Sequence, residues 1–227
     1  MGQKISIPLF RAKKRLSHVN GKGHEPTELQ KSVWFATGRA YSKTLMQDVE
    51  IRKYITNFAQ RAGLVEVIIK RNVRKVEITI YVTRPGVIIG KGGSNINLLR
   101  TELSKKFPLP NDLKLNIEEF KDPFRSASVI AHDIEEALKR NVPYRRLIKT
   151  TLDKIRYSGV QGAKIQVKGR LNGAEIARKE EVTYGSIPRH TIDSNLDYAS
   201  VHAKTAAGII GIKVILNKGN KFTNYTY

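Results

Sequence analysis

A glycine-rich turn just ahead of a helical pattern constrains the fold of this chain more than any other stretch. Residues 87–93 read Val-Ile-Ile-Gly-Lys-Gly-Gly, and residues 94–107 carry apolar side chains at helical spacing. Glycines leave the backbone open to a sugar-phosphate strand, and amide groups at the start of a helix attract phosphate. A lysine at the tip adds positive charge. The pattern predicts a phosphate-binding turn made by Gly90, Lys91, Gly92 and Gly93.

Two nucleotide-binding loops that use similar glycines do not fit this stretch. A Walker A loop has four residues between its first glycine and Gly-Lys, followed by Ser or Thr. Here Gly86 is one residue too close to Gly90, and Gly92 stands where the hydroxyl should be. A dinucleotide-binding fingerprint would have glycine in place of Asn95. An ordinary tight turn before a helix remains the alternative, so the interpretation depends on the surrounding elements.

The net charge indicates a polyanionic partner. The 227 residues include 41 Lys and Arg against 20 Asp and Glu, which leaves +21 at neutral pH. This exceeds what solubility requires, and nucleic acid is the usual partner of such a chain. The chain has no cysteine for disulfides or thiol catalysis. No apolar run approaches the roughly 18 residues of a membrane span, so no membrane partner is expected.

The elements around the turn predict a mixed domain over residues 32–120. In order, we expect a helix, two strands, a short helix before the turn, a long helix and a third strand. The ranges of the long helices and the strands are 48–62, 64–71, 75–83, 94–107 and 113–119. Asp48 is expected to cap the first helix. Val87, Ile88 and Ile89 are expected mainly in the core, and a groove wall for bases is compatible with that. This order resembles the type II KH module, whose turn clamps about four nucleotides of RNA.

A second domain is expected over residues 121–217. Asp122-Pro123 has the composition of a helix start, and that helix should end near Asn141. A second helix follows, then strands over residues 163–171, 174–184, 196–204 and 209–216. The sequence thus predicts an α+β protein: a KH domain followed by two helices packed on a mostly antiparallel four-stranded sheet.

Basic residues gather on one face of the second helix of this domain. At about 100° per residue, Arg145, Lys149 and Arg156 point the same way, with Arg146 beside them. Lys149 and Asp153 are spaced for an ion pair. Residues 139–156 nevertheless hold seven basic side chains against that one acid, so pairing cannot neutralise the face. We expect it to contact RNA.

Further basic residues are candidate RNA contacts outside these two sites. Residues 1–16 form a basic arm without an acid, residues 17–31 are expected to be an exposed inserted loop, and residues 218–227 a loose tail. Alternation in the strand at 163–171 makes one of its faces basic. The candidates in the arm and in the strands are Lys4, Arg11, Lys13, Lys14, Arg15, Lys164, Lys168, Arg170 and Arg178.

The sequence offers little for a catalytic or metal site. Its five histidines are scattered, and no pair has the spacing of metal ligands. Asp193 and Asp197 are the only carboxylates that suggest a nuclease, and they read as loop residues. We therefore expect no catalytic residue, no metal and no cofactor. A free KH protein that regulates messages is one function that these RNA-binding features allow.

Longer runs make the resemblance more specific. The chain resembles the bacterial-type family of the KH-bearing ribosomal protein three of the small subunit. The runs that carry this resemblance are residues 1–4, 33–36, 84–93, 169–178, 190–191, 197–199 and 209–214. Residues 11–15, residues 17–31, Asp193 and Ile215 depart from the family's pattern.

The resemblance implies a place in the head of the small ribosomal subunit, in the cytoplasm of a bacterium or in an organelle. Ribosomal RNA would be the main ligand, and neighbouring ribosomal proteins of the head would be partners. It also implies a role at the entrance of the messenger RNA channel, where the family's Arg-Arg-x-x-Lys cluster helps to open structured messages. That cluster corresponds here to Arg145, Arg146 and Lys149.

Overall fold

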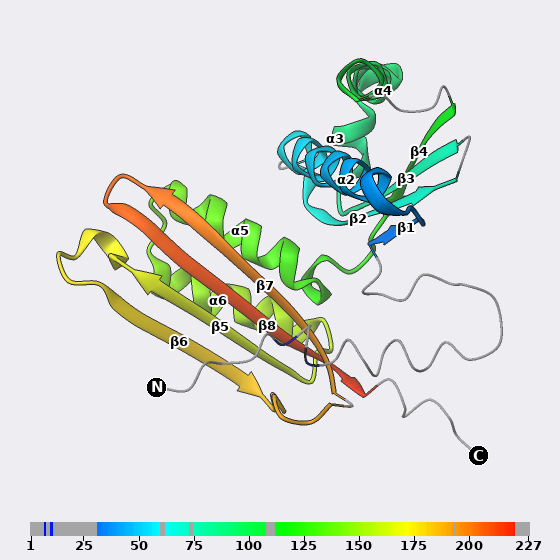
Figure 1. Ribbon diagram of the computed structural model, residues 1–227. Helices are drawn as coiled ribbons and strands as arrows, with labels where there is room; N and C mark the ends of the chain where they lie inside the picture. The colour runs from blue at the N-terminus through cyan, green and yellow to red at the C-terminus, as the bar shows by residue number, and fades with distance from the viewer. Residues whose placement is uncertain are drawn as a thin grey trace. The chain divides into compact units, whose positions relative to one another are not determined.

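The chain forms two compact units, which divide between Lys121 and Asp122. Each has its own four-stranded sheet and its own apolar core, which confirms the predicted α+β fold class. The computed structural model describes Ile7, Phe10 and residues 31–59, 62–72, 75–107, 112–192 and 194–220 (Figure 1). The candidates that lie outside the described residues are Lys4, Arg11, Lys13, Lys14, Arg15 and Asp193.

The first unit follows the predicted order of elements and adds a short strand before them. Its sheet has the order β1-β2-β3-β4, with β2 and β3 antiparallel and both outer pairs parallel. Apolar side chains of α2, α4 and the sheet form one core, so both helices cover the same face. The elements are β1 (Ser32–Val33), α2 (Gly38–Phe58), β2 (Leu64–Arg71), β3 (Lys75–Val82), α3 (Pro85–Ile89), the 3-10 turn η2 (Lys91–Gly93), α4 (Ser94–Lys106) and β4 (Asp112–Glu119).

The helix α2 begins ten residues before the predicted start, so the assignment of Asp48 as its cap is wrong. Apolar side chains in the added turns, such as Tyr41 and Met46, are exposed, so core-facing periodicity begins only later in the helix. The Asp48 carboxylate is buried inside α2 instead. It accepts hydrogen bonds from Ser32 Oγ at 3.0 Å, Trp34 Nε1 at 2.7 Å and Arg71 Nε at 2.7 Å. One buried acid therefore ties β1, α2 and β2 together.

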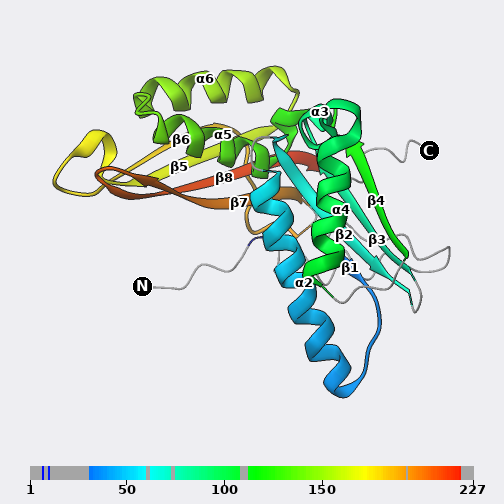
Figure 2. The same cartoon turned by 90° about the horizontal axis from the view of Figure 1, so that it is seen from above.

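The second unit is the predicted pair of helices on an antiparallel sheet of order β6-β5-β8-β7. The helix α5 contacts β7 and β8, and α6 contacts β5 and β6, on one face of the sheet (Figure 2). Its elements are η3 (Pro123–Arg125), α5 (Ala127–Lys139), α6 (Tyr144–Tyr157), β5 (Gly162–Gly169), η4 (Leu171–Gly173), β6 (Arg178–Gly185), β7 (Ser194–Thr205) and β8 (Gly208–Asn220).

Three predicted boundaries in this unit are wrong, and the first two involve a long-range contact. Asp122-Pro123 leads into a 3-10 turn, and α5 begins at Ala127, whose amide donates to the Asp197 carboxylate on β7 at 3.0 Å. The strand β8 continues to Asn220, so residues 218–220 are not a loose tail; Lys218 lies 3.1 Å from Asp197. Residues 174–177 form a loop before β6 instead of belonging to that strand.

Replacing Asp48 with alanine should destabilise the first unit strongly. The change leaves the guanidinium of Arg71, on a side chain only 12% exposed, without its carboxylate. Breaking a buried pair in this way costs about 3 to 5 kcal/mol. The chain's single tryptophan, Trp34, donates to Asp48, so its fluorescence during urea unfolding reports on this unit.

Glu50→Ala is the matched control, because Glu50 is an exposed acid on the same helix. It should change the free energy of unfolding by no more than about 0.5 kcal/mol. Equal losses in the two variants would show that the buried carboxylate has no special part in holding β1, α2 and β2 together.

Candidate nucleic-acid interface

The glycine turn is shaped by left-handed backbone conformations that favour glycine. Gly90 ends α3 with φ at +72°, and a Cβ there would lie 2.7 Å from Cγ of Asn95. Gly92 has φ at +60°, and a Cβ there would meet nothing within 4 Å, so the turn is open on that side. The side chain of Asn95 donates to the carbonyl of Val87 at 3.2 Å. This hydrogen bond ties α4 to α3 across the turn.

Two of the three apolar residues before the turn are exposed, which corrects their assignment to the core. Ile88 is buried, whereas Val87 is 46% and Ile89 is 38% exposed. The short helix α3 can point only part of its surface at the core. Leu98, on α4 just after the turn, is 59% exposed. The turn thus offers exposed backbone and a lysine, with apolar side chains nearby that suit the faces of bases.

The predicted basic face of α6 is exposed in the structure. Tyr144, Ile148 and Ile155 of this helix are buried against the sheet. The side chains that we call the α6 ridge lie on the outer surface: Arg145, Arg146, Lys149 and Arg156. Within the described ranges, no carboxylate forms an ion pair with Arg146 or Lys149, and the pair that the sequence allowed between Lys149 and Asp153 is not formed.

Residues of β6 hold the two ends of the α6 ridge. The hydroxyl of Tyr144 donates to Glu180 Oε1 at 2.8 Å, and Nη2 of Arg145 donates to the same oxygen at 3.3 Å. The Tyr144 hydroxyl and the Arg145 guanidinium lower the pKa of Glu180, with a further contribution from the charge of Arg178. At the other end, the Arg156 guanidinium lies 5.5 Å from the centre of the Tyr184 ring. Sequence patterns did not identify Glu180, because its contacts lie 35 residues away.

Two of the three predicted basic residues around β5 have partners within the protein. Lys164 lies 3.0 Å from Glu181, and Lys179 lies 2.9 Å from the same carboxylate. These two lysines lower the pKa of Glu181 to about 2. Arg170 donates to the carbonyls of Ala174 at 2.9 Å and Ala207 at 3.2 Å, so it joins two loops.

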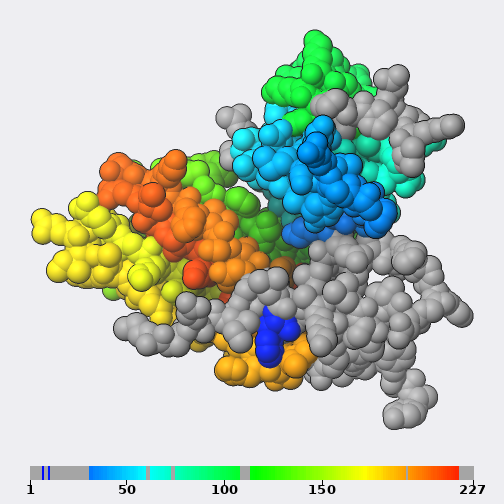
Figure 3. Space-filling model, viewed as in Figure 1, coloured from blue at the N-terminus to red at the C-terminus, as the bar shows by residue number. Residues whose placement is uncertain are grey.

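Lys168 is exposed and, within the described residues, is the member of this group that forms no ion pair or side-chain hydrogen bond. It stands directly opposite Lys179 in the register of β5 and β6. Like charges placed opposite each other weaken strand pairing, and an anion would relieve that cost. Figure 3 views the second unit from the face of the sheet that α5 and α6 leave uncovered.

The described residues show no grouping suited to a metal or a nuclease. No three His, Asp or Glu side chains within these ranges are placed to hold a metal ion. Asp197 caps α5 and pairs with Lys218, so its carboxylate has a structural role. Across the same residues, no helix is both long and apolar enough to cross a membrane.

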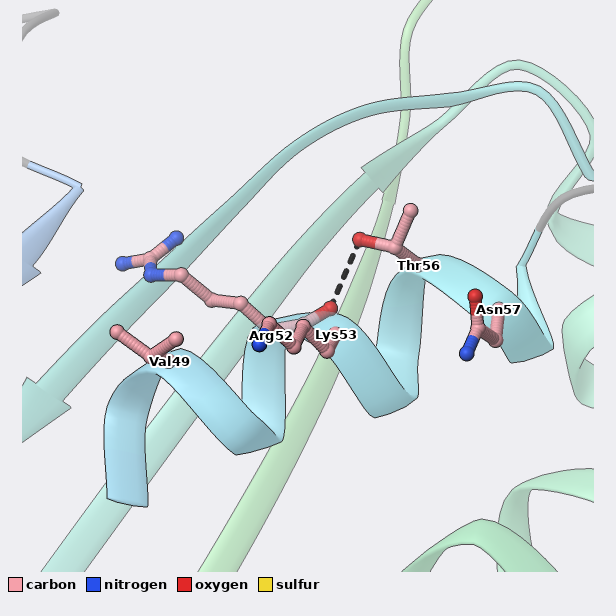
Figure 4. Close-up of a pocket in the computed structure, with 5 residues that line it drawn as sticks. All are labelled: Val49, Arg52, Lys53, Thr56 and Asn57. Carbon is pink, nitrogen blue, oxygen red and sulfur yellow. Dashed lines mark hydrogen bonds between the residues drawn. The ribbon is translucent and has the colours of Figure 1, made fainter. Parts of the chain in front are cut away.

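A hollow on α2 is lined by Val49, Arg52, Lys53, Thr56 and Asn57 (Figure 4). The Arg52 guanidinium is already engaged, since it donates to Ser32 Oγ at 2.8 Å and to the backbone carbonyls of Lys31 and Val67. Burial lowers the pKa of Arg52, although the charges of Asp48 and Glu66 oppose this. Arg52 therefore holds β1 and β2 to α2 and is not available to a ligand in the hollow.

Family models match both units of the chain. The KH domain model matches residues 50–125, and the model for the C-terminal domain of ribosomal protein S3 matches residues 134–216. The first match contains the glycine turn and the second contains the α6 ridge.

Curated relatives extend the similarity over most of the chain. The small ribosomal subunit protein uS3c of Guillardia theta is 36% identical over 225 residues, which is 99% of each chain. The uS3 proteins of Saccharophagus degradans and Vesicomyosocius okutanii are 41% and 43% identical over 188 residues. That alignment covers 83% of this chain in both cases, and 83% and 81% of the relatives. With the KH fold and the basic surfaces described above, these matches show that the chain belongs to the family of small ribosomal subunit protein uS3.

Proposed function

We propose that this protein is a structural, RNA-binding constituent of the head of the small ribosomal subunit and has no catalytic centre of its own. The open glycine turn, flanked by exposed apolar side chains, is the observation that carries this proposal. Ribosomal RNA is its main ligand, and neighbouring ribosomal proteins of the head are its partners. The ribosome is that of a bacterial cytoplasm or of an organelle.

The glycine turn suits a single RNA strand for two reasons. Its backbone can approach the phosphates closely, because no side chain stands on Gly92, and Lys91 adds a charge beside them. Exposed Val87 and Ile89 offer apolar contact to bases that have left a stack. Phosphate contacts supply affinity, whereas the apolar contacts orient the strand.

The α6 ridge is the part of the protein that we assign to messenger RNA at the entrance of its channel. Arg145, Arg146 and Lys149 lie within about one helical turn of one another and are exposed. Their spacing is the Arg-Arg-x-x-Lys pattern of the family. A cationic ridge of this kind binds the separated strands of a message through their phosphates, which disfavours re-pairing.

The remaining basic candidates are proposed as contacts to ribosomal RNA. Lys168 and Arg178 are exposed and are the stronger candidates in the second unit. Lys164 and Arg170 already have partners within the protein, so they contribute less. The basic arm of residues 1–16 belongs to the same proposal, through Lys4, Arg11, Lys13, Lys14 and Arg15.

Replacing Lys91 and Gly92 with aspartate should weaken binding to small-subunit RNA at least about tenfold, because carboxylates repel phosphates. Asp tolerates the left-handed conformation of Gly92 better than most residues, so the unit should still fold. The measurement is a binding titration with the purified chain at fixed salt. Trp34 fluorescence during urea unfolding checks that stability is kept.

The control Ser42→Asp with Lys43→Asp makes the same change in charge at the start of α2, which lies at the other end of this unit from α3 (Figure 2). It should weaken binding much less. Equal weakening by the two double variants would show that only total charge matters and that the turn is not a clamp.

Replacing Arg145, Arg146 and Lys149 together with alanine should slow translation of structured messages more than that of unstructured ones. The loss of three phosphate contacts should also lower the salt slope for binding single-stranded RNA by about 2. Arg39, Lys43 and Lys53 on α2, changed together to alanine, remove the same charge elsewhere. If the ridge variant slowed both kinds of message equally, its role would be in assembly rather than at the channel.

A further inference from the structure

We propose that Glu180 competes with RNA phosphate for Arg145, so that RNA dissociates from the α6 ridge faster than it would without this carboxylate. This inference rests on the proposed function of the ridge and adds a residue that regulates it. Arg145 alternates between the carboxylate of Glu180 in the free protein and a phosphate in the complex. The exchange breaks one ion pair and forms another, and no covalent bond changes.

The Glu180 carboxylate is held in place independently of Arg145. The Tyr144 hydroxyl donates to its Oε1 at 2.8 Å, and the Tyr144 side chain is only 6% exposed within the core of the second unit. Because Tyr144 is buried, its hydroxyl keeps a fixed position whether or not RNA is bound. The competing carboxylate therefore stays within reach of Arg145 when a phosphate arrives and when it leaves.

The contact between Arg145 and Glu180 is weak enough to exchange. It consists of one hydrogen bond of 3.3 Å, and the Arg145 side chain is 73% exposed. Charge-assisted hydrogen bonds of nitrogen to oxygen are strongest at about 2.7 to 2.9 Å, and exposed ion pairs contribute little. A phosphate can accept two parallel hydrogen bonds from a guanidinium, so it replaces a single long contact with a better one.

The other positions of the ridge differ from Arg145 in this respect. Within the described part of the chain, no acid pairs with Arg146 or Lys149. Arg178 is the other cation that acts on Glu180, and it lies on the same strand. The ridge thus combines cations that bind phosphate directly with one that must first leave a carboxylate. Competition by Glu180 shortens the lifetime of the complex, which suits a messenger RNA that must move along its channel.

The test measures how fast a single-stranded RNA of about 20 nucleotides dissociates from the full-length Glu180→Gln variant and from the full-length chain without the substitution. Glutamine keeps an acceptor for Tyr144 and removes the charge that competes for Arg145. At about 0.1 M salt the RNA should dissociate roughly two to five times more slowly from the variant. In an Arg145→Ala background, the same substitution should have no effect on the dissociation rate.

Glu181→Gln is the matched control. It removes one carboxylate from the adjacent residue, which points to the opposite face of the sheet and pairs with Lys164 and Lys179. This variant releases Lys164 and Lys179 on the face of the sheet away from the ridge, so it should slow dissociation less than Glu180→Gln does. Equal slowing by both glutamine variants, or slowing by Glu180→Gln that persists without Arg145, would overturn the inference.

Two further measurements separate the possible failures. If Glu180→Gln does not fold, Glu180→Thr removes the same carboxylate with a residue that suits a strand, and the same rates are expected. If the Arg145, Arg146 and Lys149 variant binds the RNA as well as the unchanged chain does, the proposed function of the ridge itself is wrong. If that variant binds poorly while Glu180→Gln has no effect, only the role of Glu180 is rejected.

Discussion

A four-stranded sheet needs one face covered by apolar side chains, and in both units a pair of helices provides that cover. In the first unit α2 and α4 lie on the sheet through Ile51, Ile55, Leu99 and Leu103. In the second, α5 and α6 do so through residues such as Ile134 and Ile148. This constraint decides which surfaces are left for binding residues. The inner faces of the helices are committed to the core, so the basic residues occupy their outer faces, and the open backbone lies in the turn between α3 and α4.

Acidic residues organise much of this cationic protein. Asp48 collects three donors from β1, the segment after it and β2, while Asp197 caps α5 and pairs with Lys218. Glu181 lies between two lysines on one side of β6, and Glu180 lies beside Tyr144 and Arg145 on the other. Some of these carboxylates reduce repulsion between neighbouring cations, as Glu181 does between Lys164 and Lys179. Others accept a hydrogen bond from a backbone amide, as Asp197 does from Ala127. The basic side chains without such a partner are the ones that we propose as contacts to RNA phosphates.

The sequence patterns located the elements with a strong period and missed those without one. The pattern of residues 75–83 predicted β3, and helical spacing predicted the exposed basic face of α6. The first turns of α2 were not predicted, because Tyr41 and Met46 are exposed and do not lie on the buried face that Ile51 and Ile55 form. Val87 and Ile89 were predicted in the core on hydrophobicity alone, whereas the short α3 helix buries only Ile88.

The sequence by itself determined the order of elements, the glycine turn and the basic face of α6, because each depends on residues that are near one another along the chain. The tertiary structure alone decided which charges are used within the protein. Glu180 meets Arg145 across 35 residues, and Asp197 meets the start of α5 across 70. Local periodicity has no information on such distances, since they depend on how helices pack on a sheet. The division of the basic residues into those held by an acid and those available to RNA is therefore a property of the folded chain.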